Sequence, residues 1–243
     1  TREQTPDDLL KQADTAMYQA KADGRSTVRA FDAAMQKKVD KRLRIHNQLR
    51  DALRNHELML YYQPQHMVAT GELIGAEALI RWQHPTRGLL SPASFIPIIE
   101  NHPLGIDVGK WTIEAALTQI EVWRKAGLHV PISVNIGARH LLQPDFIMHL
   151  RGMLSRHPGA QSQDLELEIL ETSAVEDFVQ VSQLMALCER MGLRFALDDF
   201  GSGYSSLTYL KRLPAYLLKI DQGSIRDMLE DPDDIAILDA LLA

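Results

Sequence analysis

The chain has 243 residues, 45% hydrophobic and 24% charged, a composition typical of soluble globular proteins and a length that allows one large α/β domain or two small ones. Its formal net charge of −6 argues against nonspecific binding of a nucleic-acid polymer, which usually requires a basic excess. The one cysteine, Cys188, excludes a disulfide framework and fits a reducing compartment.

The N-terminal segment predicts a helix but no complete domain. Residues 5–22 begin with Thr5, a favourable N-cap, and Pro6, which suits the first helical position. One face of this helix would be apolar, with Leu9, Leu10, Ala13, Met17 and Ala20. The apolar stretch at 28–31 predicts a short strand. Such a segment is too small to fold alone, so we expect its apolar face to need a partner outside this chain.

Residues 33–54 predict a second helix, whose apolar stripe is interrupted by many lysines and arginines. The stripe consists of Met35, Val39, Leu43, Leu49 and Leu53. We favour a solvated connecting helix. A signalling or dimerisation helix, and with it a homodimer, stays open as the alternative.

From residue 58 onward, short strand-like runs alternate with amphipathic stretches. The runs are 58–63, 73–82, 130–136, 165–170, 195–199 and 216–221, and the helical stretches are 106–126, 145–156, 178–191 and 205–212. This alternation predicts a largely parallel sheet with helices packed outside it. A short turn at Thr70 and Gly71 separates the first two runs, which therefore predict an antiparallel hairpin.

Five of these strands carry a charged or amide residue at or near the carboxyl end, where α/β barrels form their active sites. These residues are Glu77 and Arg81, Asn135, Glu168 with Glu166 on the same face, Asp198 and Asp199, and Lys219 and Asp221. Carboxylates packed together repel one another, and a divalent cation would offset the repulsion. An all-oxygen ligand set suits Mg²⁺, Mn²⁺ or Ca²⁺ rather than zinc.

A purely structural interpretation of each residue is also available. A single glutamate on a strand usually faces solvent, and Lys219 could form a structural ion pair within the acidic cluster. All five strands together make this interpretation weaker, because central parallel strands are covered on both faces.

Six segments, in order, resemble the EAL family of cyclic-di-GMP phosphodiesterases over residues 52–243. They are Tyr62-Gln63-Pro64, Glu77-Ala78-Leu79 with Ile80-Arg81-Trp82, Ser133-Val134-Asn135-Ile136, Glu168-Ile169-Leu170-Glu171-Thr172, Asp198-Asp199-Phe200-Gly201 with 202–207, and Leu218-Lys219-Ile220-Asp221. Six motifs in order are far more specific than the EAL tripeptide alone.

The resemblance implies a TIM-like (β/α)₈ barrel with an antiparallel first strand, and hydrolysis of cyclic di-GMP to linear pGpG with two Mg²⁺ or Mn²⁺ ions. By motif, the metal ligands would be Glu77, Asn135, Glu168, Asp198 and Asp199, with Asp199 serving the second ion. Lys219 would position the attacking water, and Glu171 would hold the loop that carries the two aspartates. Gln63, Leu79, Arg81 and Asp221 would contact the substrate.

The N-terminal helix contains Ala13-Asp14, Ala16-Met17-Tyr18 and Ala20-Lys21 and is followed by Gly24-Arg25. With these residues, the segment 1–32 resembles the C-terminal end of a GGDEF domain, which makes residues 33–51 a linker helix. The GGDEF signature loop is not in this sequence, so we expect no cyclase activity from the chain itself. The chain begins at Thr1 rather than Met, so we expect a piece of a longer protein, with upstream GGDEF or sensor domains. For the family's last two strands, which are not in this sequence, three explanations stay open: truncation of a longer protein, disorder of these strands, or completion of the barrel by a second chain. No run is long enough to span a membrane and no signal peptide is visible, which predicts a cytoplasmic location; a membrane anchor upstream in the longer protein stays open.

Three hypotheses follow for the function. The first is an active phosphodiesterase in the longer protein, with weak or no turnover in this shortened chain. The second is a non-catalytic receptor for cyclic di-GMP. The third is a regulatory or dimerisation module that works through residues 33–54.

Overall fold

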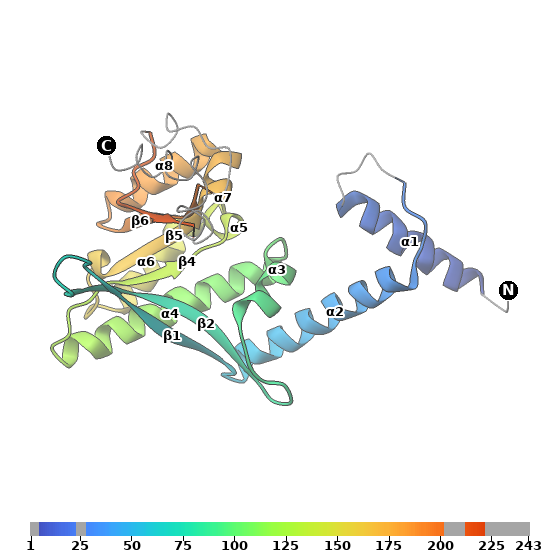
Figure 1. The fold of residues 1–243 in the computed structure, drawn as a ribbon, viewed down its shortest axis with the longest axis horizontal. Helices are drawn as coiled ribbons and strands as arrows, with labels where there is room; N and C mark the ends of the chain where they lie inside the picture. Colours follow the sequence, from blue (N-terminus) through green and yellow to red (C-terminus); the bar gives the residue numbers. More distant parts are fainter. Residues whose placement is uncertain (1–4, 23–27, 202–211, 222–243) are drawn as a thin grey trace. The chain divides into compact units, whose positions relative to one another are not determined.

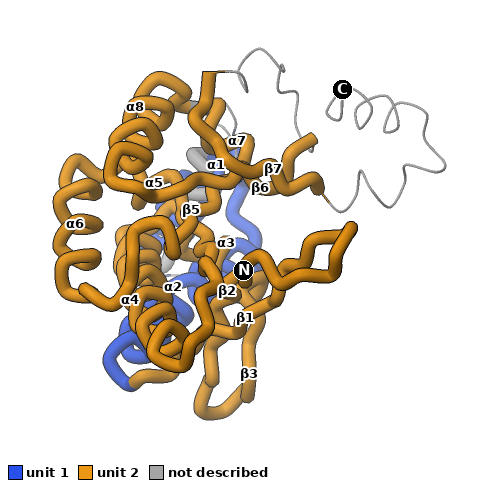
Figure 2. The backbone as a smooth tube through the Cα atoms, turned by 90° about the vertical axis from the view of Figure 1, so that its left-hand side faces the viewer, with its two compact units in different colours: residues 1–55 blue, residues 56–243 orange. Residues whose placement is uncertain are grey.

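The computed structural model describes residues 5–22, 28–201 and 212–221 and divides into two units, residues 1–55 and 56–243 (Figure 2). The first unit contains α1 (Pro6–Ala22) and α2 (Ala33–Arg54), which confirms both predicted helices. Thr15 Oγ1 lies 3.0 Å from Gln36 Oε1 and links α1 to α2. The side chain of Asp32 caps α2 by accepting a hydrogen bond from the Ala34 amide.

The predicted strand at 28–31 is wrong. These residues have no regular structure, and the side chain of Val28 is 96% exposed. A strand needs a neighbour to satisfy its backbone groups, and the described part of the first unit offers none.

The second unit is a mixed α/β structure built on a mostly parallel sheet. Its strands are β1 (Leu58–His66), β2 (Leu73–His84), β3 (Gly88–Leu90), β4 (Ile132–Asn135), β5 (Leu165–Leu170), β6 (Arg194–Phe200) and β7 (Leu217–Ile220). Its helices are α3 (Ile96–Ile99), α4 (Pro103–Lys125), α5 (Ala138–Leu141), α6 (Phe146–Arg156), α7 (Glu171–Glu176) and α8 (Phe178–Glu189), with 3₁₀ turns at Pro92–Ser94 and Ser162–Asp164.

The strand order is β1-β2-β4-β5-β6-β7, with β3 paired to the end of β2 (Figure 1). All six predicted strands and the predicted helices at 106–126, 145–156 and 178–191 are therefore present, with small shifts at their ends. The helix predicted at 205–212 lies almost wholly outside the described residues. No periodic signal in the sequence predicted β3, α3, α5 and α7, which are three to six residues long.

The β1–β2 hairpin is antiparallel, as predicted, and its turn fixes the register. Met67 and Glu72 close the turn, where the Met67 amide donates to the Glu72 carbonyl at 2.8 Å. Gly71 has φ +72°, a conformation that favours glycine. The register that follows places Gln63 opposite Glu77.

The hydrophobic core lies between the sheet and the helices α4, α6 and α8. Helix α4 shows how the sequence builds it. His102 caps the N-terminus through Nδ1, and Ile113, Leu117 and Ile120 recur on one buried face. Each such side chain contributes about 1.5–3 kcal/mol on burial. The helix therefore covers the sheet without contributing charged groups to its centre.

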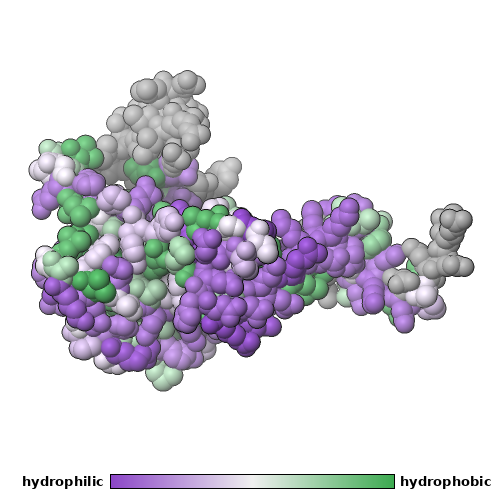
Figure 3. Space-filling model, turned by 90° about the horizontal axis from the view of Figure 1, so that it is seen from below, coloured by the Kyte–Doolittle hydropathy of each residue, from purple (hydrophilic) through white to green (hydrophobic). Residues whose placement is uncertain are grey.

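The surface is predominantly hydrophilic on the face shown in Figure 3, with hydrophobic side chains in scattered patches. None of the helices in the described part of the chain combines the length and apolarity that a bilayer crossing requires.

Candidate functional site

Polar side chains from neighbouring parallel strands share one face of the sheet near the carboxyl ends. Asn135 on β4 stands opposite Glu168 on β5 in the strand register. Glu77 on β2 stands opposite Ser133, two residues before Asn135 and on the same face as it. Asp198 follows on β6, opposite Leu170. The register alone therefore brings these side chains to one end of the sheet.

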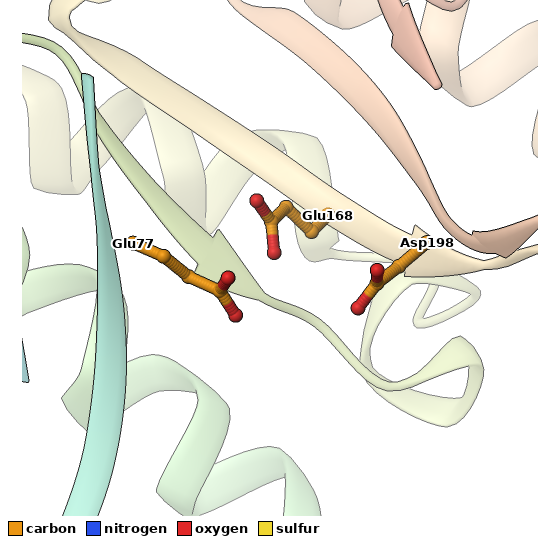
Figure 4. A group of neighbouring side chains, drawn as sticks. All are labelled: Glu77, Glu168 and Asp198. Atoms are coloured by element: carbon orange, nitrogen blue, oxygen red, sulfur yellow. The ribbon is translucent and has the colours of Figure 1, made fainter. Parts of the chain in front are cut away.

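Glu77, Glu168 and Asp198 form a compact acidic cluster and point toward one another (Figure 4). One carboxylate oxygen from each residue lies within 4.8 Å of those from the other two. Asn135 joins them, because its Nδ2 donates to Glu77 Oε1 at 2.9 Å. The amide oxygen of Asn135 is not used in this contact and remains a potential ligand atom.

Lys219 on β7 supplies a positive charge to the cluster. Its Nζ donates to Glu77 Oε2 at 2.6 Å and to Glu168 Oε2 at 2.8 Å, and it lies 3.6 Å from Asp198 Oδ1. Burial alone would lower the pKa of Lys219, but the hydrogen bonds to the two glutamates outweigh this effect and hold the pKa above its ordinary value. The ammonium group therefore stays charged.

Glu168 is the most buried member of the cluster, with 0% of its side chain exposed. Burial raises its pKa, and the neighbouring charge of Glu77 raises it further, against the opposing effect of Lys219. The pKa of Glu168 reaches about 7 as a result. One positive charge does not fully compensate for the carboxylates in this space.

An irregularity in the register near the end of β6 presents the two consecutive aspartates differently. Asp199 has φ +54°, the left-handed region that is uncommon for residues other than glycine. Its amide donates to Asp198 Oδ1 at 3.0 Å. Burial and the charges of Asp198 and Asp221 raise the pKa of Asp199. The left-handed backbone at Asp199 thus lets two adjacent residues of β6 both serve the same end of the sheet.

Glu171 holds the segment that follows these aspartates. Its carboxylate is buried, and Oε2 accepts a hydrogen bond from the Gly201 amide at 3.0 Å. The backbone at Gly201 has φ +94°, so the chain bends directly after β6. This contact ties the start of α7 to the end of β6.

The residues fit a divalent metal ion on two grounds. Glu168 Oε1 is buried and has no hydrogen-bond partner among the residues that the structure describes. Such an orphaned acceptor is costly unless a cation or a water satisfies it. The ligand atoms available from Glu77, Asn135, Glu168 and Asp198 are all oxygens, which suits a hard cation.

The residues predicted to contact substrate lie around this cluster rather than within it. Gln63 stands opposite Glu77 in the hairpin register. Leu79 lines a cavity of about 340 Å³ that also reaches Asn135 and Glu168. Arg81 packs its guanidinium over the ring of Tyr61. Asp221 follows β7 and acts on the cluster through its charge on Asp199.

Sequence reasoning missed several residues of the cavity wall, including Gly109, Arg139 and His140. His140 is 2% exposed, and burial lowers its pKa to about 4. A Cβ at Gly109 would lie 2.4 Å from His140 Nδ1, so the ring occupies the space that glycine leaves. The signal in the sequence was Gly109 inside a long helical stretch. Glycine lowers helix stability, so its presence there indicates that a neighbouring side chain needs the space.

Comparison with known proteins gives a consistent result. Residues 46–243 match the family described as EAL domain. The chain is 38% identical, over 99% of its length, to the bifunctional diguanylate cyclase/cyclic di-GMP phosphodiesterase MucR of Pseudomonas aeruginosa. It is 34% identical, over 97% of its length, to the cyclic di-GMP phosphodiesterase PdeR of Escherichia coli. The chain spans 35% of the length of each of these relatives.

Solved structures share the fold. A structure of the PaMucR phosphodiesterase in complex with c-di-GMP has a TM-score of 0.76 at 38% identity, covering 81% of this chain and 80% of that one. The EAL enzyme Bd1971, in a form bound to cAMP and cyclic di-GMP, has a TM-score of 0.77 at 28% identity, covering 99% of this chain and 63% of that one. These matches confirm the predicted TIM-like barrel class for the sheet and helices of the second unit.

Proposed function

The chain belongs to the EAL domain family, and on that premise we propose that it hydrolyses one phosphodiester bond of cyclic di-GMP to give linear pGpG. The observation that carries the proposal is the acidic cluster of Glu77, Glu168 and Asp198, in which Glu168 Oε1 is buried without a hydrogen-bond partner among the described residues. Cyclic di-GMP is the ligand named for PaMucR and the substrate in the name of PdeR. Both proteins are similar to this chain across most of the second unit.

Glu77, Asn135, Glu168 and Asp198 would hold one ion of Mg²⁺ or Mn²⁺, and Asp199 would serve a second. When bound, the ions would supply electrostatic stabilisation of the phosphate oxygens and a more acidic water. The buried oxygens of Glu168, with a raised pKa and an unpaired Oε1, are the part of the site that such ions would stabilise most.

The remaining residues would bind the substrate, orient the attacking water and hold the two aspartates in place. Lys219, which stays charged, would hold the attacking water through one of its three N–H donors. Arg81 would bind a phosphate oxygen pair with its planar fork of donors. Gln63, Leu79 and Asp221 would contact the substrate. Glu171 would keep Asp198 and Asp199 in place through its contact with Gly201.

The test is an assay with cyclic di-GMP and Mn²⁺, with pGpG measured by chromatography, of this chain and of a version extended through the family's last two strands. The Glu77→Ala variant should lose turnover by at least about 100-fold, since it removes a ligand and a partner of Lys219. A matched control is Glu189→Ala, which removes an exposed carboxylate at the end of α8. No turnover by the extended protein, or equal turnover of the extended protein and its Glu77→Ala variant, would contradict the proposal.

A second candidate is a receptor that binds cyclic di-GMP without hydrolysing it. The contact of Lys219 with three carboxylates favours it, because an ammonium already compensates for part of the charge that a metal ion would neutralise. The same assay separates the candidates when it is paired with calorimetric binding. Binding without pGpG formation in the presence of Mn²⁺ would support the receptor.

The domain boundaries remain a proposal as well. We propose that residues 1–32 are the end of a GGDEF domain, 33–51 a linker helix and 52–243 the EAL domain. The match to MucR, whose name includes a diguanylate cyclase and which aligns over 99% of this chain, supports the first assignment. Leu9 and Leu10 are 52% and 65% exposed in this chain. In a protein that also contains the segment upstream of Thr1, these residues should be covered, and the backbone amides around them should exchange hydrogen more slowly.

A further inference from the structure

We propose that Tyr61 is a substrate-positioning residue: its ring holds the guanidinium of Arg81 in place for a phosphate group of the substrate. The inference rests on the proposed function and adds to it a residue outside the six sequence motifs. Tyr61 lies on β1 and Arg81 on β2 of the hairpin, and Glu77 of the acidic cluster also lies on β2.

The hairpin register places Tyr61 on the same face as the site. Gln63 pairs with Glu77, and Tyr61 pairs with Leu79. Residues two apart on a strand share a face, so Tyr61 lies on the face that carries Glu77. Arg81 is the diagonal neighbour of Tyr61 across the two strands, a spacing that long side chains can bridge.

The contact between the two side chains is direct. The guanidinium carbon of Arg81 lies 5.5 Å from the centroid of the Tyr61 ring, within the range of a cation–π interaction. Nη1 of Arg81 also donates to the carbonyl of Ile80, its own neighbour, at 3.0 Å. These contacts orient the guanidinium without neutralising its charge.

Arg81 makes no ion pair with any carboxylate in the described part of the chain, although the acidic cluster lies on the same face. An arginine with no carboxylate partner, held over an aromatic ring, keeps its outer donors available to a planar or tetrahedral anion. A phosphate oxygen pair of a cyclic dinucleotide meets this description. Lys219, by contrast, is already committed to Glu77 and Glu168.

The exposure of Tyr61 argues against a purely packing role. Its side chain is 48% exposed, whereas the adjacent Tyr62, on the opposite face, packs its ring on Trp123 at 5.0 Å. Burial raises the pKa of Tyr62 to about 12, which marks it as the structural tyrosine of the pair. Tyr62 therefore provides a matched control on the same strand.

The experiment measures the dissociation constant of cyclic di-GMP by calorimetry for the whole chain in EDTA, where no turnover is expected. The variants are Tyr61→Ile, Tyr61→Phe, Arg81→Ala and the double variant Tyr61→Ile/Arg81→Ala, with Tyr62→Phe as the control. Isoleucine suits a strand, so the hairpin should still form. Unfolding midpoints for all variants show whether folding is affected.

We expect Tyr61→Ile to weaken binding roughly two- to fivefold, the range of an exposed cation–π contact, while Tyr61→Phe and Tyr62→Phe bind like wild type. In the Arg81→Ala background, Tyr61→Ile should have no further effect. Equal affinities of Tyr61→Ile and wild type, or the same loss in both backgrounds, would overturn the inference alone. A wild-type chain that binds no cyclic di-GMP, with or without Mn²⁺, would overturn the proposed function and this inference together.

Discussion

Glu77 and Glu168 lie on strands that are not adjacent, β2 and β5, yet both accept a hydrogen bond from the same ammonium, at 2.6 and 2.8 Å. Strand β4 lies between them in the sheet, and Asn135 on β4 binds Glu77. The two carboxylates therefore belong to one electrostatic unit, which spans the sheet from β2 to β7. Four predictions follow from this unit and the elements around it.

Replacing Lys219 by methionine should destabilise the metal-free protein. The variant leaves three carboxylates without their common cation, and breaking a buried pair costs about 3 kcal/mol at the lower end of the observed range. For a chain of this size the melting temperature in EDTA should fall by roughly 5–10 °C. Mn²⁺ should recover much of that loss while turnover stays lower by at least about 100-fold. An unchanged melting temperature in EDTA would show that the cluster does not need this charge.

Removal of metal should make stability depend on the protonation of Glu168. The pKa of this carboxyl is raised from 4.5 to about 7, so the folded state binds more protons than the unfolded state between these values. The preferential protonation of Glu168 in the folded state adds to the free energy of unfolding. This contribution is complete below pH 4.5 and is lost as the pH rises through about 7, by at most about 3 kcal/mol.

Denaturant titrations in EDTA at pH 5.5 and 7.5 measure this difference, and Glu168→Gln, which cannot ionise, is the control. Added Mn²⁺ should stabilise the wild type more at pH 7.5 than at pH 5.5, because ligand carboxylates must be deprotonated. The same slope in wild type and Glu168→Gln would assign the pH dependence to other groups.

Glu171 should affect catalysis through the loop rather than through the substrate. Glu171→Ala removes the acceptor for the Gly201 amide and should lower kcat with little change in KM. The lost hydrogen bond to a charged acceptor is worth about 1.5–3 kcal/mol. Glu171→Gln keeps an acceptor oxygen and should retain most of the activity. If both variants raise KM without lowering kcat, Glu171 acts on substrate binding instead.

Two glycine substitutions in helices should have opposite effects on stability. Gly109→Ala on α4 would place its Cβ 2.4 Å from His140 Nδ1 and should cost about 1–3 kcal/mol. Gly152→Ala on α6 meets only Arg156 Nη1 at 3.6 Å, so it should stabilise the protein by about 0.5–1 kcal/mol. Chemical denaturation measures both. A stabilised Gly109→Ala variant would mean that the His140 ring moves aside freely.

The sheet and the acidic cluster were predictable because their signals are local and repeated. Each of the central strands β4, β5 and β6 is an apolar run that ends in or contains a polar residue, and helical stretches separate the runs. Parallel order then brings the carboxyl ends together without any knowledge of side-chain contacts. The structure brings Glu77, Asn135, Glu168, Asp198 and Lys219 into contact as that reasoning required.

The parts that sequence reasoning missed depend on contacts between distant residues. The strand predicted at 28–31 had the right composition but has no described strand beside it. The contact of Tyr61 with Arg81 follows from the hairpin register, which the sequence alone does not specify side chain by side chain. The space shared by Gly109 and His140 joins α4 to α5, a helix of four residues that is too short for a periodic signal.

The turn between β1 and β2 offers a practical attachment point. It joins the end of β1 to the start of β2, which begins four residues before Glu77. The turn therefore lies at the end of the sheet opposite to the carboxyl ends of the parallel strands, where the acidic cluster is. Val68 in this turn is fully exposed. A fluorophore on a cysteine introduced at position 68, or a short epitope inserted there, would mark the protein for imaging or capture while leaving the acidic cluster untouched, and the buried native Cys188 would not compete for the label.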